Sequence, residues 1–349
     1  MVNWVWQKFV KDFGIDLGTS NSLVYLKGKG IVVNEPSIVA LNNKTSQILA
    51  VGDSAKKMLG REPTHVSVVR PLVGGVVSDF DITEEIIRQF LNRFKSYPVS
   101  YFNRAVVGVP GGLTEVERKS IEDAILGSGI AKVHLIDSTL AAVIGARLPV
   151  NEPAANLIVD IGGGTTEIGV ISLNGVVATK SLKIAGDRFN SDILDYIREE
   201  FRLVIGEPTA EALKIAIGSA MPIEGRLELS IRGRDLSSGL PREVIVKNNQ
   251  IRLAIGRSLH SIVENIKTVI EATPPELVGD ILERGIYLCG GGSLLRGIDQ
   301  LIKKELSINA TIVDDPLTCV VRGVGSIIED FQKYNHLFAV EAKVRAIKL

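Results

Sequence analysis

The fold is decided by two stretches of sequence that match each other: Gly14-Ile15-Asp16-Leu17-Gly18-Thr19-Ser20-Asn21-Ser22-Leu23-Val24-Tyr25-Leu26 and Val159-Asp160-Ile161-Gly162-Gly163-Gly164-Thr165-Thr166-Glu167-Ile168-Gly169-Val170-Ile171. In each stretch an apolar run ends on an Asp, glycine and hydroxyl residues follow, and a second strand-like run begins. Because glycine lacks a Cβ atom, backbone N–H groups at such a turn can close around an anionic oxygen, and Ser and Thr hydroxyls add donors. Each stretch therefore predicts a β-hairpin whose tip can approach phosphate.

The two hairpin tips predict a site that grips a polyphosphate from both sides. The residues expected to hold its β- and γ-phosphates are Gly18, Thr19, Ser20 and Asn21 in the first tip and Gly162, Gly163, Gly164 and Thr165 in the second. An Asp would repel bare phosphate, so Asp16 and Asp160 indicate a divalent cation, Mg²⁺, held mainly through water. The alternative, that each Asp only caps its own glycine-rich turn, stays open here.

A third glycine cluster indicates the class of ligand. Residues 285–297, with the sequence GIYLCGGGSLLRG, predict a buried strand, a triple-glycine turn and the start of a helix. A flat base or a sugar can lie against the exposed backbone of such a turn. Two phosphate hairpins followed by this turn therefore predict a nucleotide clamp.

The order of these three motifs resembles the superfamily of actin, the sugar kinases and the heat-shock ATPases. Within it the chain is similar to the MreB family of bacterial actins. The similar stretches run from about residue 13 to about residue 330 and include residues 28–37 (GKGIVVNEPS), 159–167 (VDIGGGTTE), 235–242 (DLSSGLPR) and 273–278 (TPPELV). The resemblance implies an α/β actin-like fold of two related domains, each with a mixed sheet flanked by helices. It also implies ATP or GTP with Mg²⁺ in the cleft between the domains.

The resemblance implies domain limits as well. Domain I would comprise residues 12–148 and 325–349, with a smaller subdomain at about 33–75. Domain II would comprise residues 149–324, with a smaller subdomain at about 182–245.

Local signals predict several helix boundaries. Thr114 with Glu117, and Thr273 with Glu276, have the spacing of capping boxes at helix starts. Gly145 marks the expected end of a helix.

The resemblance assigns the rest of the nucleotide pocket. Glu211 and Lys214 would reach the ribose and the base. The adenosine pocket would be lined by Gly290, Gly291, Gly292 and Ser293. Without the resemblance, Glu211 and Lys214 look like a solvated helix face.

One departure from the family bears on hydrolysis. Residues 135–142 (LIDSTLAA) match a stretch in which the family usually has two acidic residues and then Pro, and the second acidic residue orients the attacking water. This chain has Ser138 there, and a hydroxyl can hydrogen-bond water but is a poor acceptor of its proton. We expect slow hydrolysis, with Thr165 helping to place the water. The alternative is that Asp137, one position earlier, substitutes for the missing carboxylate.

Composition restricts the class of protein. The 349 residues are 45% hydrophobic and 23% charged, which suits a soluble globular chain with room for two cores. Lys plus Arg equals Asp plus Glu at 40 each, so no global field favours nucleic acid. The two cysteines, the lack of a signal peptide and the absence of a spanning apolar run predict a cytoplasmic location.

The N-terminus predicts contact with a membrane. In residues 1–11, helical spacing gathers an apolar face opposite a polar face with lysines, a composition typical of an interfacial helix. That face consists of Val2, Val5, Trp6, Phe9 and Val10. The alternative is that this stretch packs beside the first strand. Tyr101 and Phe102 match the position of an apolar loop through which some relatives bind membrane.

Three function classes remain. The resemblance favours a weak, filament-coupled ATPase that forms homopolymers of paired protofilaments on the inner face of the cell membrane. Its further partners would be the membrane proteins of cell-wall elongation, which maintain rod shape. A small-metabolite kinase of the same superfamily is the alternative, whereas a chaperone-type ATPase would need a longer chain after the motif at 321–325.

Overall fold

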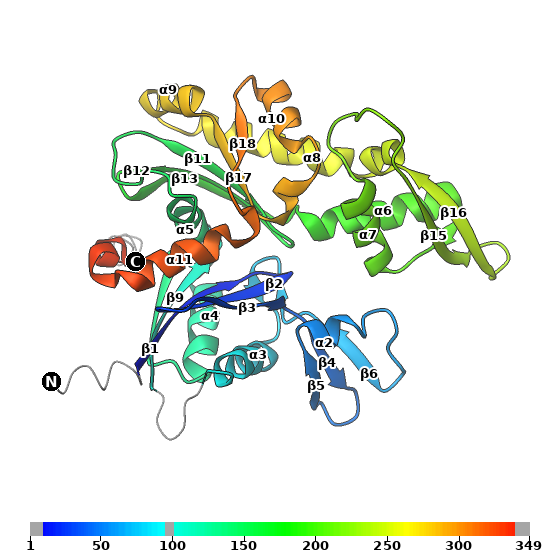
Figure 1. Cartoon of the computed structure of the whole chain (residues 1–349), viewed down its shortest axis with the longest axis horizontal. Helices are drawn as coiled ribbons and strands as arrows, with labels where there is room; N and C mark the ends of the chain where they lie inside the picture. The colour runs from blue at the N-terminus through cyan, green and yellow to red at the C-terminus, as the bar shows by residue number, and fades with distance from the viewer. Residues whose placement is uncertain (1–9, 95–100, 339–349) are drawn as a thin grey trace.

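Two five-stranded sheets of matching topology form the framework of the protein (Figure 1). The computed structural model describes residues 10–94 and 101–338. In each sheet three consecutive antiparallel strands are followed by two strands that pair in parallel. In spatial order the first sheet consists of β3 (Gly30–Pro36), β2 (Asn21–Leu26), β1 (Val10–Leu17), β9 (Tyr101–Val109) and β10 (Lys132–Asp137). The second consists of β13 (Gly175–Leu182), β12 (Thr166–Ser172), β11 (Asn156–Ile161), β17 (Ile286–Cys289) and β18 (Ala310–Ile312).

Helices cover both faces of each sheet and create three apolar cores. One core joins the first sheet to α3 (Phe80–Asn92) and α4 (Glu115–Gly127). A second core joins the other sheet to α6 (Gly186–Phe201), α7 (Glu207–Ile217), α8 (Asn248–Glu271), α9 (Pro275–Arg284) and α10 (Ile298–Leu306). The third core lies between the sheets and is built on α5 (Ser138–Gly145) and α11 (Cys319–Glu329). We call the two halves the first lobe and the second lobe, after their sheets.

Each lobe carries a small sheet at its outer end. In the first lobe this sheet has the order β5-β4-β6, and in the second lobe the order is β14-β15-β16. The strands and short helices are β4 (Val39–Asn42), β5 (Ile48–Val51), α2 (Asp53–Lys56), β6 (Val66–Val69), β14 (Leu203–Val204), β15 (Glu228–Asp235) and β16 (Pro241–Lys247). The connections include β7 (Leu72–Val73), β8 (Val76–Val77) and the 3₁₀ turns η1 (Gly291–Leu294) and η2 (Pro316–Thr318). The domain limits given above stay predictions.

The two lobes are joined by an unusually close crossing of α5 and α11. A Cβ atom on Gly323 would overlap the carbonyl oxygen of Ala141, and a Cβ atom on Gly145 would overlap that of Cys319. Glycine at both points therefore lets the two helix backbones touch. Because α11 packs on the first sheet and α5 mainly on the second, this crossing fixes how the lobes face each other.

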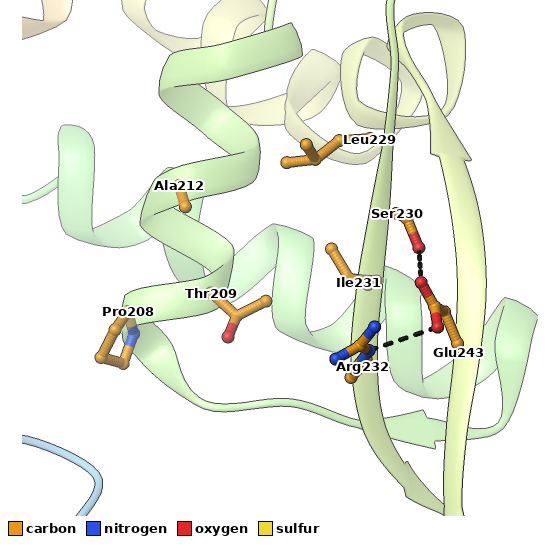
Figure 2. Close-up of a pocket in the computed structure, with 8 residues that line it drawn as sticks. All are labelled: Pro208, Thr209, Ala212, Leu229, Ser230, Ile231, Arg232 and Glu243. Atoms are coloured by element: carbon orange, nitrogen blue, oxygen red, sulfur yellow. Dashed lines mark hydrogen bonds and ion pairs between the residues drawn. The ribbon is translucent and has the colours of Figure 1, made fainter.

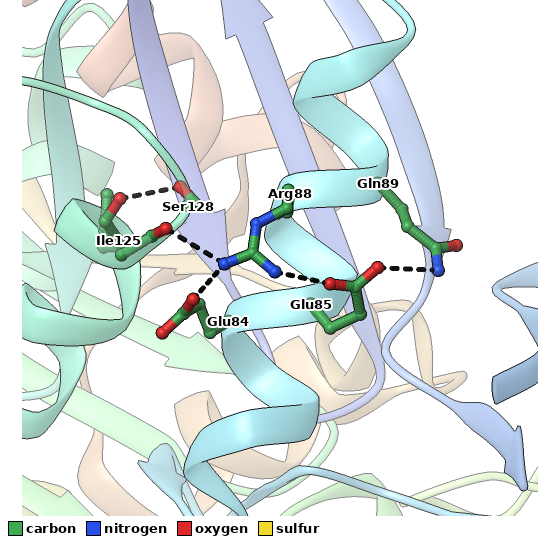
Figure 3. A network of polar contacts seen from close by, with 7 residues as sticks. Glu84, Glu85, Arg88, Gln89, Ile125 and Ser128 are labelled. Carbon is green, nitrogen blue, oxygen red and sulfur yellow. Dashed lines mark hydrogen bonds and ion pairs between the residues drawn. The ribbon is translucent and has the colours of Figure 1, made fainter. Parts of the chain in front are cut away.

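On the face of the first sheet that is turned away from α5 and α11, a polar network links α3 to the end of α4 (Figure 3). Arg88 contacts Glu84 and Glu85 on its own helix, with 2.6 Å from Nη1 to the Glu85 carboxylate, and donates to the carbonyl of Gly127 at 3.1 Å. Because the last carbonyls of a helix lack partners within it, the guanidinium acts as a cap for α4.

The predicted helix boundaries have mixed outcomes. Thr114 forms the capping box with Glu117 that its spacing predicts, and α5 ends at Gly145. The box predicted at Thr273 is wrong, because its hydroxyl donates instead to the carbonyl of Val269, 2.8 Å away, and α9 begins only at Pro275. Thr273 therefore closes the preceding helix rather than opening the next.

The structure corrects the predicted membrane contacts wherever it describes them. Val10 is the first residue of β1 and pairs with Tyr101, so neither belongs to a helix or a loop. Phe102 is 4% exposed, and its ring meets that of Phe13 edge-on at 5.3 Å between centroids. Alternation along β9 turns Phe102 into the core while Tyr101 faces out, 52% exposed. The other predicted contacts, Val2, Val5, Trp6 and Phe9, lie outside the described residues.

Nothing in the described ranges could cross a bilayer as a helix.

The glycine crossing predicts that the same substitution, Gly→Ala, changes stability in opposite directions at two helical positions. Gly323→Ala should lower the free energy of unfolding by about 1–3 kcal/mol, because the added methyl group has no space beside the Ala141 carbonyl. Gly256→Ala on α8 should raise it by about 0.5–1 kcal/mol, because that position is open and helical. Urea unfolding of both variants would measure this, and two changes of the same sign would contradict the close crossing.

Candidate functional site

A cavity of about 470 Å³ lies between the lobes and collects most of the residues that the sequence singles out. Its volume is within the range of small-molecule sites. Its lining includes Asp16, Gly18, Thr19, Ser20, Asn21, Ser138, Asp160, Gly162, Gly163, Gly164, Thr165, Glu211, Lys214, Gly290, Gly291 and Gly292. Two predicted site residues, Asp137 and Ser293, are not in that lining.

The tips of the two predicted hairpins meet across this cavity. The first tip connects β1 to β2 and the second connects β11 to β12, both antiparallel pairs. A Cβ atom on Gly163 would lie 2.7 Å from that of Ser20, and one on Gly164 would lie 2.7 Å from that of Thr19. The absence of side chains in the second tip therefore lets it approach the hydroxyl residues of the first.

The third glycine cluster closes one end of the cavity. Gly290 follows β17 with φ of +78°, and a Cβ atom there would overlap Asp160 and Ile161 of the neighbouring strand. Only glycine suits that position, since it combines a left-handed backbone with close contact. Ser293 is fully buried, and its hydroxyl donates to the Gly290 carbonyl at 2.7 Å, so it supports the turn from behind.

Three carboxyl groups converge on the cavity, and none of them forms an ion pair with another described residue. Burial and the charge of Asp160 raise the pKa of Asp16 to about 7. Burial raises the pKa of Asp160 to about 6, an effect that a hydrogen bond from Cys289 partly opposes. Burial also raises the pKa of Glu167 to about 7. The charged forms are destabilised in the ligand-free protein, a property that suits a site for a cation.

The end of the cavity near α5 contains one residue that the sequence analysis missed. Glu167 lines the cavity, as Ser138 does, with 3% of its surface exposed. Asp137 is occupied elsewhere: its carboxylate accepts from the backbone N–H of Thr139 at 2.8 Å and caps α5. The idea that Asp137 replaces the missing carboxylate therefore has no support in this geometry. Glu167 follows Thr165 by two residues, a spacing that could have drawn attention to it.

Ion pairs between the lobes surround the outer rim of the cavity. Arg70 donates to both carboxylate oxygens of Glu207, at 3.1 and 2.7 Å, and Lys56 lies 3.4 Å from Glu211. Lys214 donates to the Gly186 carbonyl at 3.0 Å, and burial lowers its pKa. The polar helix face that sequence alone suggested for Glu211 and Lys214 is thus directed into the site.

A second hollow, of about 510 Å³, lies between α7 and the β15–β16 hairpin (Figure 2). Apolar side chains such as Leu229 and Ile231 line it beside an ion pair of 3.2 Å between Arg232 and Glu243. Its charged groups already satisfy each other, so it offers no reactive group.

In the described part of the chain, no three His, Cys, Asp or Glu side chains gather as a metal-binding group. The two aspartates alone fit a cation that takes most of its ligands from water and from a bound phosphate.

The raised pKa values predict how stability changes with pH. Because the folded-state pKa of Asp16 is about 7, against 3.8 without the protein environment, the nucleotide-free protein should lose stability as pH rises from about 4 to about 7. Asn at position 16 does not ionise, so Asp16→Asn should not lose stability in this way. The unfolding free energy of the variant minus that of the wild type should therefore increase between about pH 4 and pH 7, by about 1–3 kcal/mol. Urea unfolding in EDTA at several pH values measures the difference. The exposed control Asp195→Asn should give a difference that is small at every pH, and the same flat profile for Asp16→Asn would contradict the prediction.

Comparison with known proteins identifies the family to which this chain belongs. The family model described as MreB/Mbl protein matches residues 10–336. The cell shape-determining protein Mbl of Bacillus subtilis (strain 168) is 43% identical over 325 residues, which cover 93% of this chain and 98% of that protein. The cell shape-determining protein MreB of Escherichia coli (strain K12) is 45% identical over 326 residues, covering 92% of this chain and 94% of that protein.

Solved structures agree with the sequence matches. The crystal structures of MreB5 of Spiroplasma citri bound to ADP and bound to AMPPNP each superpose with a TM-score of 0.89 at 35% identity. Each covers 93% of this chain and 98% of the other. The predicted α/β actin-like fold is therefore confirmed. This chain belongs to the MreB/Mbl family of actin-like, cell shape-determining proteins.

Proposed function

We propose that this chain binds ATP with Mg²⁺ and polymerises, in a nucleotide-dependent way, into filaments at the inner face of the cell membrane. There it organises the membrane proteins of cell-wall elongation. One observation carries the proposal: two hairpin tips, one from each lobe, face each other across a single cavity with a carboxylate at the base of each.

The proposed ligand follows from the shape and chemistry of that cavity. The tips offer backbone N–H groups and hydroxyls to phosphates, while Gly290 to Gly292 leave backbone exposed for the adenosine. Glu211 and Lys214 would contact the ribose and the base. The two MreB5 crystal structures, one bound to ADP and one to AMPPNP, support an adenine nucleotide rather than GTP.

The proposed cation suits the acidic groups at the base of the tips. Asp16 and Asp160 would hold Mg²⁺ mainly through water, and the bound ion would supply positive charge against the phosphates. Since burial already disfavours the charged carboxylates, a cation there would remove a cost that the ligand-free protein carries.

The proposed membrane contact consists of the segment before β1 and the exposed Tyr101 at the start of β9. By sequence, Val2, Val5, Trp6 and Phe9 would supply the apolar face of an interfacial helix, without Val10, which lies in β1. The buried Phe102 would not contribute to an apolar loop. Packing of that segment beside the first strand is the alternative.

Sedimentation tests the assembly. The wild-type protein should pellet in an ultracentrifuge with Mg²⁺ and ATP, and remain in the supernatant with EDTA or without nucleotide. Gly164→Ala should weaken ATP binding by about tenfold or more and suppress pelleting, because the new methyl group meets Thr19 between the tips. The control Gly279→Ala lies in open space on α9 and should behave as the wild type.

Two results would reject the filament. One is tight ATP binding with no pelleting at any protein concentration. The other is ADP production that depends on an added sugar, which would indicate a metabolite kinase.

Slow hydrolysis is tested by restoring the carboxylate. Ser138→Glu should raise the rate of phosphate release from the assembled protein by about tenfold or more, because a carboxylate accepts the proton of an attacking water far better than a hydroxyl does. A colorimetric or fluorescent phosphate assay measures it. A wild-type rate that is already high and that Ser138→Glu leaves unchanged would contradict the prediction.

A further inference from the structure

One carboxylate in the cavity has no cationic partner in the part of the chain that the structure describes, and no place in the proposed cation site. Among the described residues, the acidic side chains that line the cavity are Asp16, Asp160, Glu167, Asp187 and Glu211. Glu211 pairs with Lys56 at the rim, and Asp187 lies in the field of Arg70. Asp16 and Asp160 stand at the base of the two tips. Glu167 therefore remains for another role.

Neutral groups hold Glu167 in a defined position. Its Oε2 atom accepts from the backbone N–H of Gly111 at 3.2 Å, and its Oε1 atom accepts from the hydroxyl of Ser181 at 2.7 Å. The side chain of Thr165, in the second tip, partly opposes the rise that burial causes in the pKa of this carboxyl group. Since each carboxylate oxygen can accept two hydrogen bonds, Glu167 retains acceptor capacity toward the cavity.

An unpaired hydroxyl lies at the same end of the cavity. The first turn of α5 rests on β12, because a Cβ atom on Gly169 would lie 2.6 Å from that of Thr139. Residues 167 and 169 point to the same face of the strand, so Glu167 lies beside the start of α5. There Ser138 is 7% exposed, and its buried Oγ atom has no hydrogen-bond partner among the described residues. An unsatisfied hydroxyl is costly, so this geometry calls for a small polar occupant.

We propose that Glu167 and Ser138 together hold the water that attacks the γ-phosphate, with Glu167 as the catalytic carboxylate. This inference rests on the proposed function, because it needs ATP between the tips. The water donates one hydrogen bond to Glu167, and Ser138 supplies the second contact that fixes its direction. Ser181 and Gly111 are positioning groups, since they reach the water only through Glu167.

The reaction balances as ordinary hydrolysis. The water oxygen forms a bond to the γ-phosphorus, and the bond from that phosphorus to the bridging oxygen breaks. The bridging oxygen leaves on ADP with the electron pair. One proton of the water stays on the phosphate product, and the other passes along the Glu167 hydrogen bond to solvent.

A double-mutant cycle on the full-length chain tests the pair. In the wild-type background Glu167→Gln should lower single-turnover phosphate release by about tenfold or more, while affinity for a fluorescent ATP analogue and pelleting change little. In the Ser138→Glu background the same substitution should cost clearly less, because a second carboxylate then orients the water. Ser181→Ala should reduce the rate by a smaller factor, and the exposed control Glu243→Gln should leave it unchanged.

The outcomes separate this inference from the proposed function. If the wild-type protein does not bind the ATP analogue, both fail. If it binds and pellets, an unchanged rate in Glu167→Gln overturns the role of Glu167 alone. An equal loss of rate in the two backgrounds, or a loss that accompanies weaker nucleotide binding, shows a structural role and overturns it too. A wild-type protein with no phosphate release above background also overturns it.

Discussion

The arrangement of this molecule depends on one contact, the backbone-to-backbone crossing of α5 and α11 at Gly145 and Gly323. α11 packs on the first sheet and α5 mainly on the second, so the distance between their axes sets the distance between the lobes. Side chains at the crossing would separate the helices and, with them, the sheets. The hairpin tips could then not approach within contact of each other, and the cavity would lose its two-sided shape.

The cavity that this crossing creates between the lobes contains buried acidic groups, and burial disfavours their charged forms. Asp16 and Asp160 lie beneath the tips and Glu167 lies at the end of the cavity near α5, and burial raises the pKa of each. Buried carboxylates without cationic partners destabilise the ligand-free protein and favour binding of a cation with a polyphosphate.

Much of the fold could be predicted from local patterns, and the parts that could not be predicted depend on distant contacts. Both hairpins and the turn at Gly290 follow from residues adjacent in sequence, and the structure has them. The spacing at Thr273 suits a capping box, but the carbonyl of Val269 competes for its hydroxyl. Phe102 is core because Phe13 lies across from it. The position of Glu167 relative to Ser138 depends on how α5 lies on β12, which no local pattern encodes.

The two lobes are held together at the outer rim of the cavity by the ion pairs of Arg70 with Glu207 and of Lys56 with Glu211, and at the other end by the glycine crossing. These two contacts differ greatly in stiffness. Near-surface pairs of this kind contribute at most about 1 kcal/mol each and weaken as salt screens them. The glycine crossing, by contrast, is close-packed and tolerates little displacement. The contact between the lobes is therefore rigid at the α5–α11 crossing and weaker at the outer rim of the cavity. If the proposed nucleotide binds in this cavity, we expect it to enter where the ion pairs separate, while the glycine crossing keeps the lobes aligned.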